Sequence, residues 1–149
     1  MILISHRGNI NGPDPELENN PDQILHALSR GYDVEVDVWL DDNKGLMLGH
    51  DAPRYFIDYT FLMDSRLWCH AKNHAALEWM ISQSKYIHSF WHQNDRYTLT
   101  SRGFIWSFPR VLEAKNCIAV YPELYPDDFD FSQCEGICSD HIADYKKYK

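Results

Sequence analysis

Ionisable side chains follow short apolar stretches in the first half of the chain. His6 and Arg7 come directly after Ile2–Ser5, and Glu35 and Asp37 alternate with valines. Residues that are two apart on a strand point to the same side. Two carboxylates that face inward together are costly to bury unless a cation neutralises them. The pair therefore predicts a site for a hard divalent ion that is bound through oxygen.

Further polar residues end the next two apolar stretches. His50 follows Leu46–Leu48, while His70 and Lys72 lie at the end of Leu67–Ala71. Each of these residues, taken alone, is typical of a solvated surface or a hydrogen-bonded loop. Their common position at the same end of each strand favours one shared site. The carboxyl-terminal strand ends of a parallel barrel converge on a single mouth.

Hydrophobic patterning predicts the elements that position these side chains. Pro21 begins a helix that Gly31 ends, and Ala75–Ser82 forms a second helix. Strands are predicted at Ile2–Ser5, Tyr32–Leu40, Leu46–Leu48, Leu67–Ala71, Tyr86–Trp91, Tyr97–Ser101, Phe104–Ser107, Cys117–Tyr121 and Gly136–Ser139. In the second strand, the alternating valines face the outer layer and the carboxylates face inward.

The order of these elements predicts a single α/β domain over residues 1–149. Links between the late strands, such as Gln93–Arg96, are too short for a helical crossover. A complete eight-unit barrel usually needs about 250 residues, and this chain has 149. We therefore expect an abbreviated TIM-type (β/α) barrel whose helices are reduced in the second half. An open mixed sheet is the second candidate.

Composition argues against several classes of protein. The formal net charge is -8, so nucleic acid is not an expected partner, because an acidic chain gains nothing from counterion release. No apolar stretch approaches the roughly 20 residues that cross a bilayer, and MILISHRGN has neither the basic start nor the cleavage site of a signal peptide. Cys134, Cys138 and His141 lack the spacing and the fourth ligand of a zinc site. We expect reduced thiols and a cytoplasmic location.

Two segments, ISHRGN and ELENNPDQILHALSRGYDVEVDVWLDDNKGLMLGHD, resemble the opening of the glycerophosphodiester phosphodiesterase family, in the phospholipase C-like phosphodiesterase superfamily. That family begins with a strand that ends in HRG. A Glu-Asn pair, a helix, a strand bearing ExD and a strand ending in His-Asp follow in order. HAKN at 70–73 and the late GICSDH extend the likeness. The order of the motifs makes the resemblance far more specific than any single motif.

The resemblance implies a metal-dependent phosphodiester hydrolase. His6 and His50 would be the general acid and base, and histidines that titrate near neutrality suit both proton transfers. Glu35 and Asp37 would bind the metal ion, expected to be Mg²⁺, Ca²⁺ or Mn²⁺.

The remaining roles concern charge and substrate. Arg7 would hold the phosphate, and Lys72 would stabilise the extra negative charge of the transition state. Glu18 would lie at the edge of the site, near the metal or Arg7. Trp39 and Trp106 are the tryptophans expected to touch the substrate. Candidates from the second half of the chain are His92 and Glu123.

His70 stands where the family places a third acidic metal ligand. It lies two residues before Lys72, so both side chains should face the mouth together. A neutral imidazole nitrogen would favour Mn²⁺ or Zn²⁺ over Ca²⁺, which prefers oxygen. In the alternative interpretation, His70 only hydrogen-bonds a neighbour and water fills the coordination position.

Two main functions stay open from the sequence. The favoured one is hydrolysis of a glycerophosphodiester-like or other small, lipid-derived or sugar phosphodiester. The other is a catalytically inactive phosphate- or headgroup-binding module of the same fold. A metal nuclease is a weaker third idea because of the acidic charge. Only about 15 residues separate Asp51 from Leu67, where the family commonly has a longer insertion that roofs the site. The comparison with that family therefore implies an open cleft with Trp39 in an aromatic wall.

Overall fold

The computed structural model describes residues 1–43, 45–109, 114–125 and 129–149 of the chain. Its strands are β1 (Ile2–His6), β2 (Asp33–Asp41), β3 (Gly45–Leu48), β4 (Tyr55–Phe56), β5 (Leu67–Ala71), β6 (Ser89–Phe90), β7 (Tyr97–Leu99), β8 (Ile105–Ser107), β9 (Cys117–Val120) and β10 (Gly136–Ser139). The α-helices are α1 (Pro21–Ser29) and α2 (His74–Ser82). The 3-10 helices are η1 (Tyr59–Met63), η2 (Pro122–Leu124), η3 (Phe131–Gln133) and η4 (Ile142–Tyr148).

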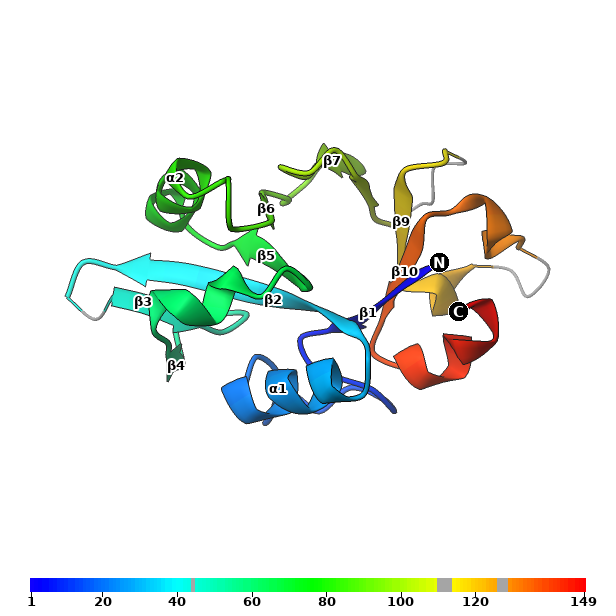
Figure 1. Cartoon of the computed structure of the whole chain (residues 1–149), viewed down its shortest axis with the longest axis horizontal. Helices are drawn as coiled ribbons and strands as arrows, with labels where there is room; N and C mark the ends of the chain where they lie inside the picture. The colour runs from blue at the N-terminus through cyan, green and yellow to red at the C-terminus, as the bar shows by residue number, and fades with distance from the viewer. Residues whose placement is uncertain (44, 110–113, 126–128) are drawn as a thin grey trace.

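The strands form one mixed sheet that curls (Figure 1). Its main path runs β4-β3-β2-β1-β10-β9-β8-β7, while β5 pairs with β2 and with β6. The pairs β1–β2, β2–β5, β5–β6, β8–β9, β9–β10 and β10–β1 are parallel. The hairpin connections β2–β3, β3–β4 and β7–β8 are antiparallel. The predicted α/β class is confirmed, and the sheet contains both the curl of the first expectation and the mixed pairing of the second.

A backbone hydrogen bond links β6 to the residue that follows β7, the two strands at the ends of the curled sheet. The backbone N–H of Ser101, just after β7, donates to the carbonyl of Ser89 in β6 at 2.8 Å. The hydroxyl of Thr98 also donates to the carbonyl of Trp91 at 2.7 Å. These contacts seat the β7–β8 hairpin beside the short β6 strand.

Two α-helices cover the first half of the sheet. Asn20 caps α1, with its side chain accepting from the N–H of Asp22, and Pro21 occupies the first turn. Asn73 caps α2 in the same way, accepting from Ala76. In the described second half, the helices are the 3-10 helices η2, η3 and η4. This distribution agrees with the expected reduction of helices, although the sequence did not predict the 3-10 helices themselves.

The core has an outer and an inner part. The valines at 34, 36 and 38 are fully buried and pack with residues of α1 and α2, as the alternation predicted. A second cluster collects side chains from six strands, and such a cluster requires a curled sheet. Its buried members are Ile4, Trp68, Phe90, Trp106, Ile118, Val120 and Cys138. Because the outer face of β2 is apolar, Glu35 and Asp37 point to the other side.

The sixth strand is much shorter than the predicted Tyr86–Trp91. The N–H groups of Tyr86 and Ile87 both donate to the carbonyl of Gln83, so the chain is still turning away from α2 there. Only Ser89 and Phe90 pair with β5. The local turn bonds therefore take the backbone groups that a longer strand would have used.

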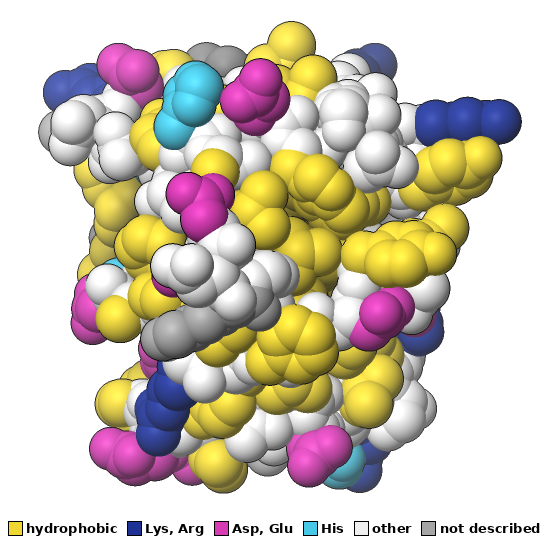
Figure 2. Space-filling view, turned by 90° about the vertical axis from the view of Figure 1, so that its left-hand side faces the viewer, with side chains coloured by type: hydrophobic (Ala, Val, Ile, Leu, Met, Phe, Trp, Pro, Cys, Tyr) yellow, Lys and Arg dark blue, Asp and Glu magenta, His cyan; other side chains and the backbone are white. Residues whose placement is uncertain are grey.

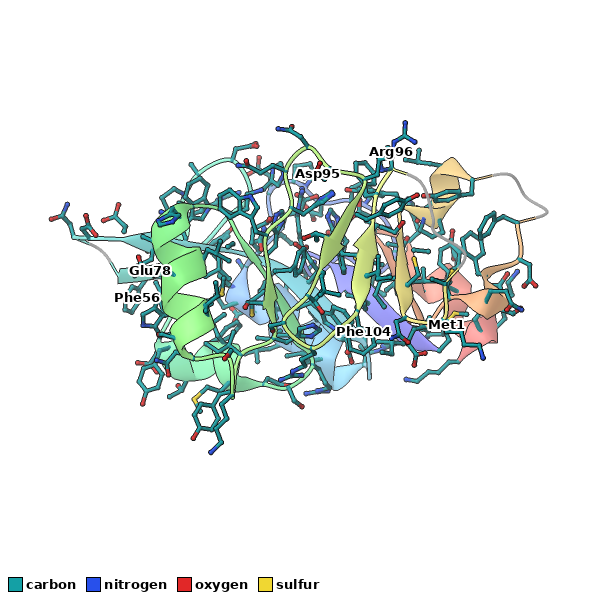
Figure 3. All side chains as sticks on the ribbon, turned by 90° about the horizontal axis from the view of Figure 1, so that it is seen from above. Met1, Phe56, Glu78, Asp95, Arg96 and Phe104 are labelled. Atoms are coloured by element: carbon teal, nitrogen blue, oxygen red, sulfur yellow. The ribbon has the colours of Figure 1, made fainter. Side chains whose placement is uncertain are left out.

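The carboxyl ends of the parallel strands lie at one edge of the molecule. In Figure 3, Met1 and Phe104, which precede β1 and β8, lie at one edge. Asp95 and Arg96, in the loop that follows β6, lie at the opposite edge. The ionisable residues that end β1, β2 and β5 therefore share the edge of that loop.

Large hydrophobic side chains gather on the face formed by β4, η1 and α2 (Figure 2). The most exposed of them on these elements are Phe56, Tyr59 and Ile81. Among the described residues, the group of side chains that could hold a metal ion lies elsewhere, on β2 and β5. Within the same ranges, no helix combines the length and the apolar character that crossing a bilayer requires.

Candidate active site

The two carboxylates of β2 are buried at the concave side of the sheet. Glu35 is 2% exposed and Asp37 is fully buried. One oxygen of each, Oε2 of Glu35 and Oδ1 of Asp37, accepts no hydrogen bond of good geometry from the described residues. Buried carboxylate oxygens without such partners are costly, and a cation is the usual remedy.

Asn19 fixes the position of Asp37. Its Nδ2 donates to Oδ2 of Asp37 at 2.9 Å, and its Oδ1 accepts from the backbone N–H of Asp37 at 2.8 Å. Asn19 adopts a left-handed backbone with φ of 61°, a conformation that asparagine tolerates better than most residues. The Glu-Asn pair of the sequence contained the signal for this residue, but sequence reasoning gave Asn19 no role.

His70 brings a nitrogen to the carboxylates. Its Nδ1 lies 3.2 Å from Oδ1 of Asp37 and 3.6 Å from Oε1 of Glu35. One ligand atom from each of these three residues lies within 4.8 Å of the other two. Burial disfavours the charged ring, but the two carboxylates outweigh it and raise the pKa of His70 to about 9. A positive charge is therefore favoured between these groups, and a bound divalent ion would replace the proton on Nδ1.

Two cationic side chains, those of Arg7 and Lys72, also form ion pairs with Asp37. Nε of Arg7 lies 3.1 Å from Oδ2, and Nζ of Lys72 lies 3.4 Å from Oδ1. Burial disfavours ionisation of Asp37, but His70, Arg7 and Lys72 together hold its pKa below the usual range. The carboxylate is therefore ionised throughout the neutral pH range.

Glu18 holds Arg7 rather than the metal-ligand group. Nη1 of Arg7 lies 2.8 Å from Oε2 of Glu18, and Nδ2 of Asn9 donates to Oε1 at 3.2 Å. Burial opposes the charge on Arg7, yet Asp37, Glu35 and Glu18 raise its pKa. Glu18 thus lies at the edge of the site beside Arg7, one of the two positions that the sequence suggested.

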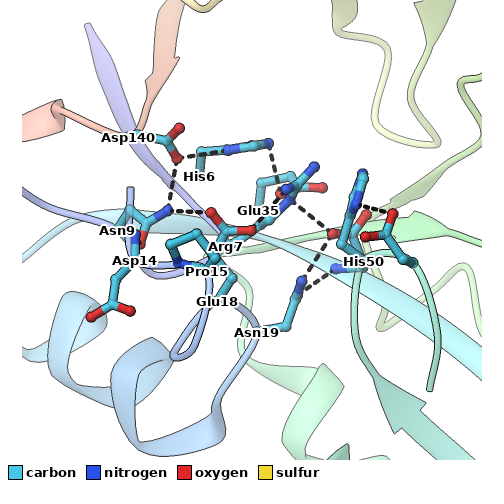
Figure 4. Close-up of polar contacts among 12 residues, drawn as sticks. His6, Arg7, Asn9, Asp14, Pro15, Glu18, Asn19, Glu35, His50 and Asp140 are labelled. Atoms are coloured by element: carbon cyan, nitrogen blue, oxygen red, sulfur yellow. Dashed lines mark hydrogen bonds and ion pairs between the residues drawn. The ribbon is translucent and has the colours of Figure 1, made fainter. Parts of the chain in front are cut away.

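His6 is oriented by a residue that sequence reasoning missed. Its Nδ1 lies 2.8 Å from Oδ1 of Asp140, just after β10, and Nδ2 of Asn9 donates to the same oxygen at 2.8 Å (Figure 4). The hydroxyl of Tyr121 lies 3.1 Å from the same ring nitrogen. Nε2 of His6 faces Glu35 at 3.8 Å from Oε2. Burial opposes ionisation of Asp140, but His6 and Asn9 lower its pKa.

The side chain of His50 is 40% exposed, more than those of His6, Arg7, Glu35, Asp37, His70 and Lys72. Its Nδ1 lies 2.7 Å from Oδ1 of Asp51. The turn before it requires glycine, because a Cβ on Gly49 would lie 2.1 Å from the carbonyl oxygen of Ala52. Nε1 of Trp39 donates to the carbonyl of Gly49 at 2.6 Å. Trp39 therefore supports the His50 turn and is not among the residues that line the cavity.

A cavity of about 470 Å³ brings these groups together. Its polar wall contains His6, Arg7, Glu35, His50, His70 and Lys72. The rest of the lining comes from the second half of the chain and consists of His92, Gln93, Asn94, Trp106, Phe108, Val120 and Tyr121. Trp106, which the sequence suggested as a substrate contact, and His92, which it left as a candidate, are both in this lining. Glu123 instead accepts a hydrogen bond from Ser139.

Backbone strain is concentrated at the same place. Within the described ranges, the non-glycine residues with positive φ are Arg7, Asn19 and Tyr121. Arg7 and Tyr121 line the cavity, and Asn19 binds Asp37. Left-handed backbone at bulky residues costs free energy and persists where surrounding contacts enforce it, which is common at functional sites.

No family model, curated protein or solved structure matches this chain.

Proposed function

We propose that this chain is a metal-dependent phosphodiester hydrolase that resembles the glycerophosphodiester phosphodiesterases and has an abbreviated (β/α) barrel. One observation carries the proposal. A buried carboxylate pair, two histidines and two cationic side chains line or adjoin a single cavity at the carboxyl ends of β1, β2 and β5. Groups of these kinds suit the hydrolysis of a phosphodiester. The negative charge on the phosphate must be neutralised, and protons must be taken from the nucleophile and given to the leaving oxygen.

The residues that would hold the ion are Glu35, Asp37 and His70. Their ligand atoms lie within 4.8 Å of one another, and the buried carboxylates of Glu35 and Asp37 are of the kind that binds a divalent cation. When bound, Mg²⁺, Ca²⁺ or Mn²⁺ would supply positive charge to the non-bridging oxygens of the phosphate. Lys72 and the free side of Arg7 would add to this charge in the cavity.

Proton transfer would fall to His6 and His50. Because a carboxylate oxygen only accepts, His6 donates from Nδ1 to Asp140 and keeps Nε2 available toward the cavity. One histidine would remove the proton from the attacking hydroxyl or water, and the other would protonate the leaving oxygen as the P–O bond breaks. If a neighbouring hydroxyl of the substrate attacks, the product would be a cyclic phosphate.

The substrate would be a glycerophosphodiester-like or other small, lipid-derived or sugar phosphodiester. The lining suits such a molecule, because it combines the cationic side chains of Arg7 and Lys72 with aromatic and amide groups. The proposal includes a cytoplasmic location. The acidic net charge of -8 disfavours nucleic acid as the substrate.

One observation favours the second candidate, a phosphate- or headgroup-binding module without turnover. Arg7 and Lys72 both lie within ion-pair distance of Asp37, so this carboxylate has cationic partners even without a metal ion. A cavity neutralised in this way would bind a phosphate and leave it intact.

A chromogenic phosphodiester separates these functions. Purified protein is assayed with bis(p-nitrophenyl) phosphate and Mg²⁺, Ca²⁺ or Mn²⁺, and again with a chelator. Glu35→Gln should lower turnover by about 10²-fold or more, whereas Glu78→Gln on the exposed face of α2 should leave it unchanged. Equal rates with and without chelator, or full activity in folded Glu35→Gln, would exclude the metal-dependent hydrolase. Phosphate binding without turnover under every ion would favour the module.

A further inference from the structure

His70 occupies a defined position relative to the carboxylates. It lies opposite Asp37 in the parallel register of β2 and β5, and its side chain is 15% exposed. The ring stacks on Phe90 of β6, with 4.9 Å between ring centroids and 5° between ring planes. Packing on one side and pairing on the other hold the imidazole plane in place.

A main-chain carbonyl decides which ring nitrogen is free. Nε2 of His70 lies 2.8 Å from the carbonyl oxygen of His92. A carbonyl oxygen can only accept, so Nε2 carries a hydrogen. In the neutral ring, the lone pair must then be on Nδ1, which is the nitrogen that faces Glu35 and Asp37.

The spacing of these atoms fits a common ion. Two ligands that each lie about 2.0–2.2 Å from one metal ion are about 2.8–3.6 Å apart in octahedral or tetrahedral geometry. Nδ1 of His70 lies 3.2 Å from Asp37 and 3.6 Å from Glu35. The imidazole is therefore placed as a ligand, with its second nitrogen held by an outer partner in the way metal-binding histidines usually are.

The loop that supplies the carbonyl is itself fixed. The ring of His92 hydrogen-bonds the carbonyl of Asp95, and the hydroxyl of Thr98 donates to the carbonyl of Trp91. These two contacts lie on either side of the His92 carbonyl. The loop after β6 thus orients a ligand on β5.

We infer that His70 binds the metal ion directly through Nδ1, in the tautomer set by the His92 carbonyl, so that the site is mixed in nitrogen and oxygen and prefers Mn²⁺ or Zn²⁺ to Ca²⁺. This inference deepens the proposed function and rests on its metal site, but it does not require turnover. Calcium selects oxygen ligands, whereas imidazole suits transition metals. Replacing a carboxylate by imidazole also lowers the negative charge around the ion by one.

Pulsed electron paramagnetic resonance of the Mn²⁺-loaded protein tests the inference, because a directly bound imidazole nitrogen modulates the signal of the ion. We expect ¹⁴N modulation in the wild type and its loss in His70→Asp, which still binds Mn²⁺ through three carboxylates. The ratio of Mn²⁺ to Ca²⁺ affinity, measured by calorimetry, should fall by about 10-fold in that variant. His74→Asp, an exposed change at the start of α2, should keep both wild-type properties.

Three outcomes would overturn the inference. These are wild-type protein that binds Mn²⁺ without ¹⁴N modulation, modulation that persists in His70→Asp, and an unchanged affinity ratio. Should His70→Asp fail to fold, His70→Asn provides the same comparison without a new charge. Wild-type protein that binds no Mn²⁺ at all would remove both this inference and the metal-dependent hydrolase. Nitrogen coordination without phosphodiesterase activity would support the inference and remove only the proposed hydrolysis.

Discussion

Nδ1 of His6 lies 2.8 Å from Oδ1 of Asp140, although the two residues are 134 positions apart in the sequence. The parallel pairing of β1 with β10 brings them together, because Ser5 and Ser139 are partners in that register. The carboxylate fixes both the tautomer and the orientation of the ring, and it directs Nε2 toward Glu35.

Loss of this contact should slow catalysis without unfolding the protein. We expect Asp140→Asn to lower turnover by about 10- to 100-fold, since the amide carries no charge to stabilise a protonated His6 ring. Initial rates on the chromogenic phosphodiester measure the effect, and circular dichroism checks the fold. Asp22→Asn, on the exposed first turn of α1, is the matched control. Wild-type turnover in Asp140→Asn would mean that the dyad does not serve catalysis.

His50 should be essential although it is partly exposed. His50→Ala removes one of the two proton-transfer groups, so turnover should fall by about 10²- to 10⁴-fold. A plot of the wild-type rate against pH should be bell-shaped. In the variant, the rate should depend less on pH on one side of the optimum. Full activity in well-folded His50→Ala would remove the central claim of histidine acid and base catalysis.

The turn that presents His50 should tolerate no side chain at Gly49. Its φ is 152°, and an added Cβ would lie 2.1 Å from the carbonyl oxygen of Ala52. We expect Gly49→Ala to destabilise the fold by about 2–4 kcal/mol, because the backbone itself must move. Urea unfolding measures the loss. Gly103→Ala also introduces a Cβ at positive φ, but with nothing within 4 Å of it, so it should cost clearly less.

Acid should destabilise the protein partly through His88. Its Nε2 pairs with the hydroxyl of Thr100 at 2.8 Å, and its ring lies against Trp68. Burial, with a smaller contribution from Arg102, lowers the pKa of His88 from 6.5 to about 4. The unfolded chain therefore binds a proton more readily between these values. This contribution to stability is complete above pH 6.5 and is lost as the pH falls toward 4.

Comparison with His88→Gln isolates that contribution. Urea unfolding at pH 7 and at pH 4.5 should show a larger loss in the wild type than in the variant, by on the order of 1 kcal/mol. Carboxylates that titrate in the same range affect both proteins alike, so the difference reports on His88. Parallel losses in the two proteins would assign the acid sensitivity to other groups.

Metal binding should raise thermal stability. Mn²⁺ at 100 times its Kd should stabilise the folded state by about 2.7 kcal/mol, which corresponds to a rise in Tm of about 5–10 °C for a chain of this size. Glu35→Gln should abolish most of this rise while leaving the metal-free Tm equal or higher, because it removes a buried carboxylate. Differential scanning fluorimetry with and without a chelator measures both. An equal rise in the variant would place the ion elsewhere.

Much of the site could be predicted because its signals are local. The alternation in β2 has a period of two, so the valines and the carboxylates had to face opposite sides. The abrupt end of an apolar run at His6 and Arg7 marked the end of β1. Pro21 marked the start of α1 in the same way. Each inference needed only neighbouring residues and the geometry of one element.

Contacts in the site between residues that are far apart in the sequence depend on the curl of the sheet. Asp140 meets His6 only because β10 returns beside β1. The part of the cavity lining from the second half of the chain comes from β8, β9 and the segments that follow β6, β8 and β9. Trp39 was predicted at the substrate, yet its indole turns to the carbonyl of Gly49. The sequence by itself determined which ionisable residues lie at the ends of β1 and β5 and which face of β2 carries the carboxylates. The curl of the sheet decided which strand ends meet, because register and side-chain direction across distant segments are set by packing and not by local periodicity.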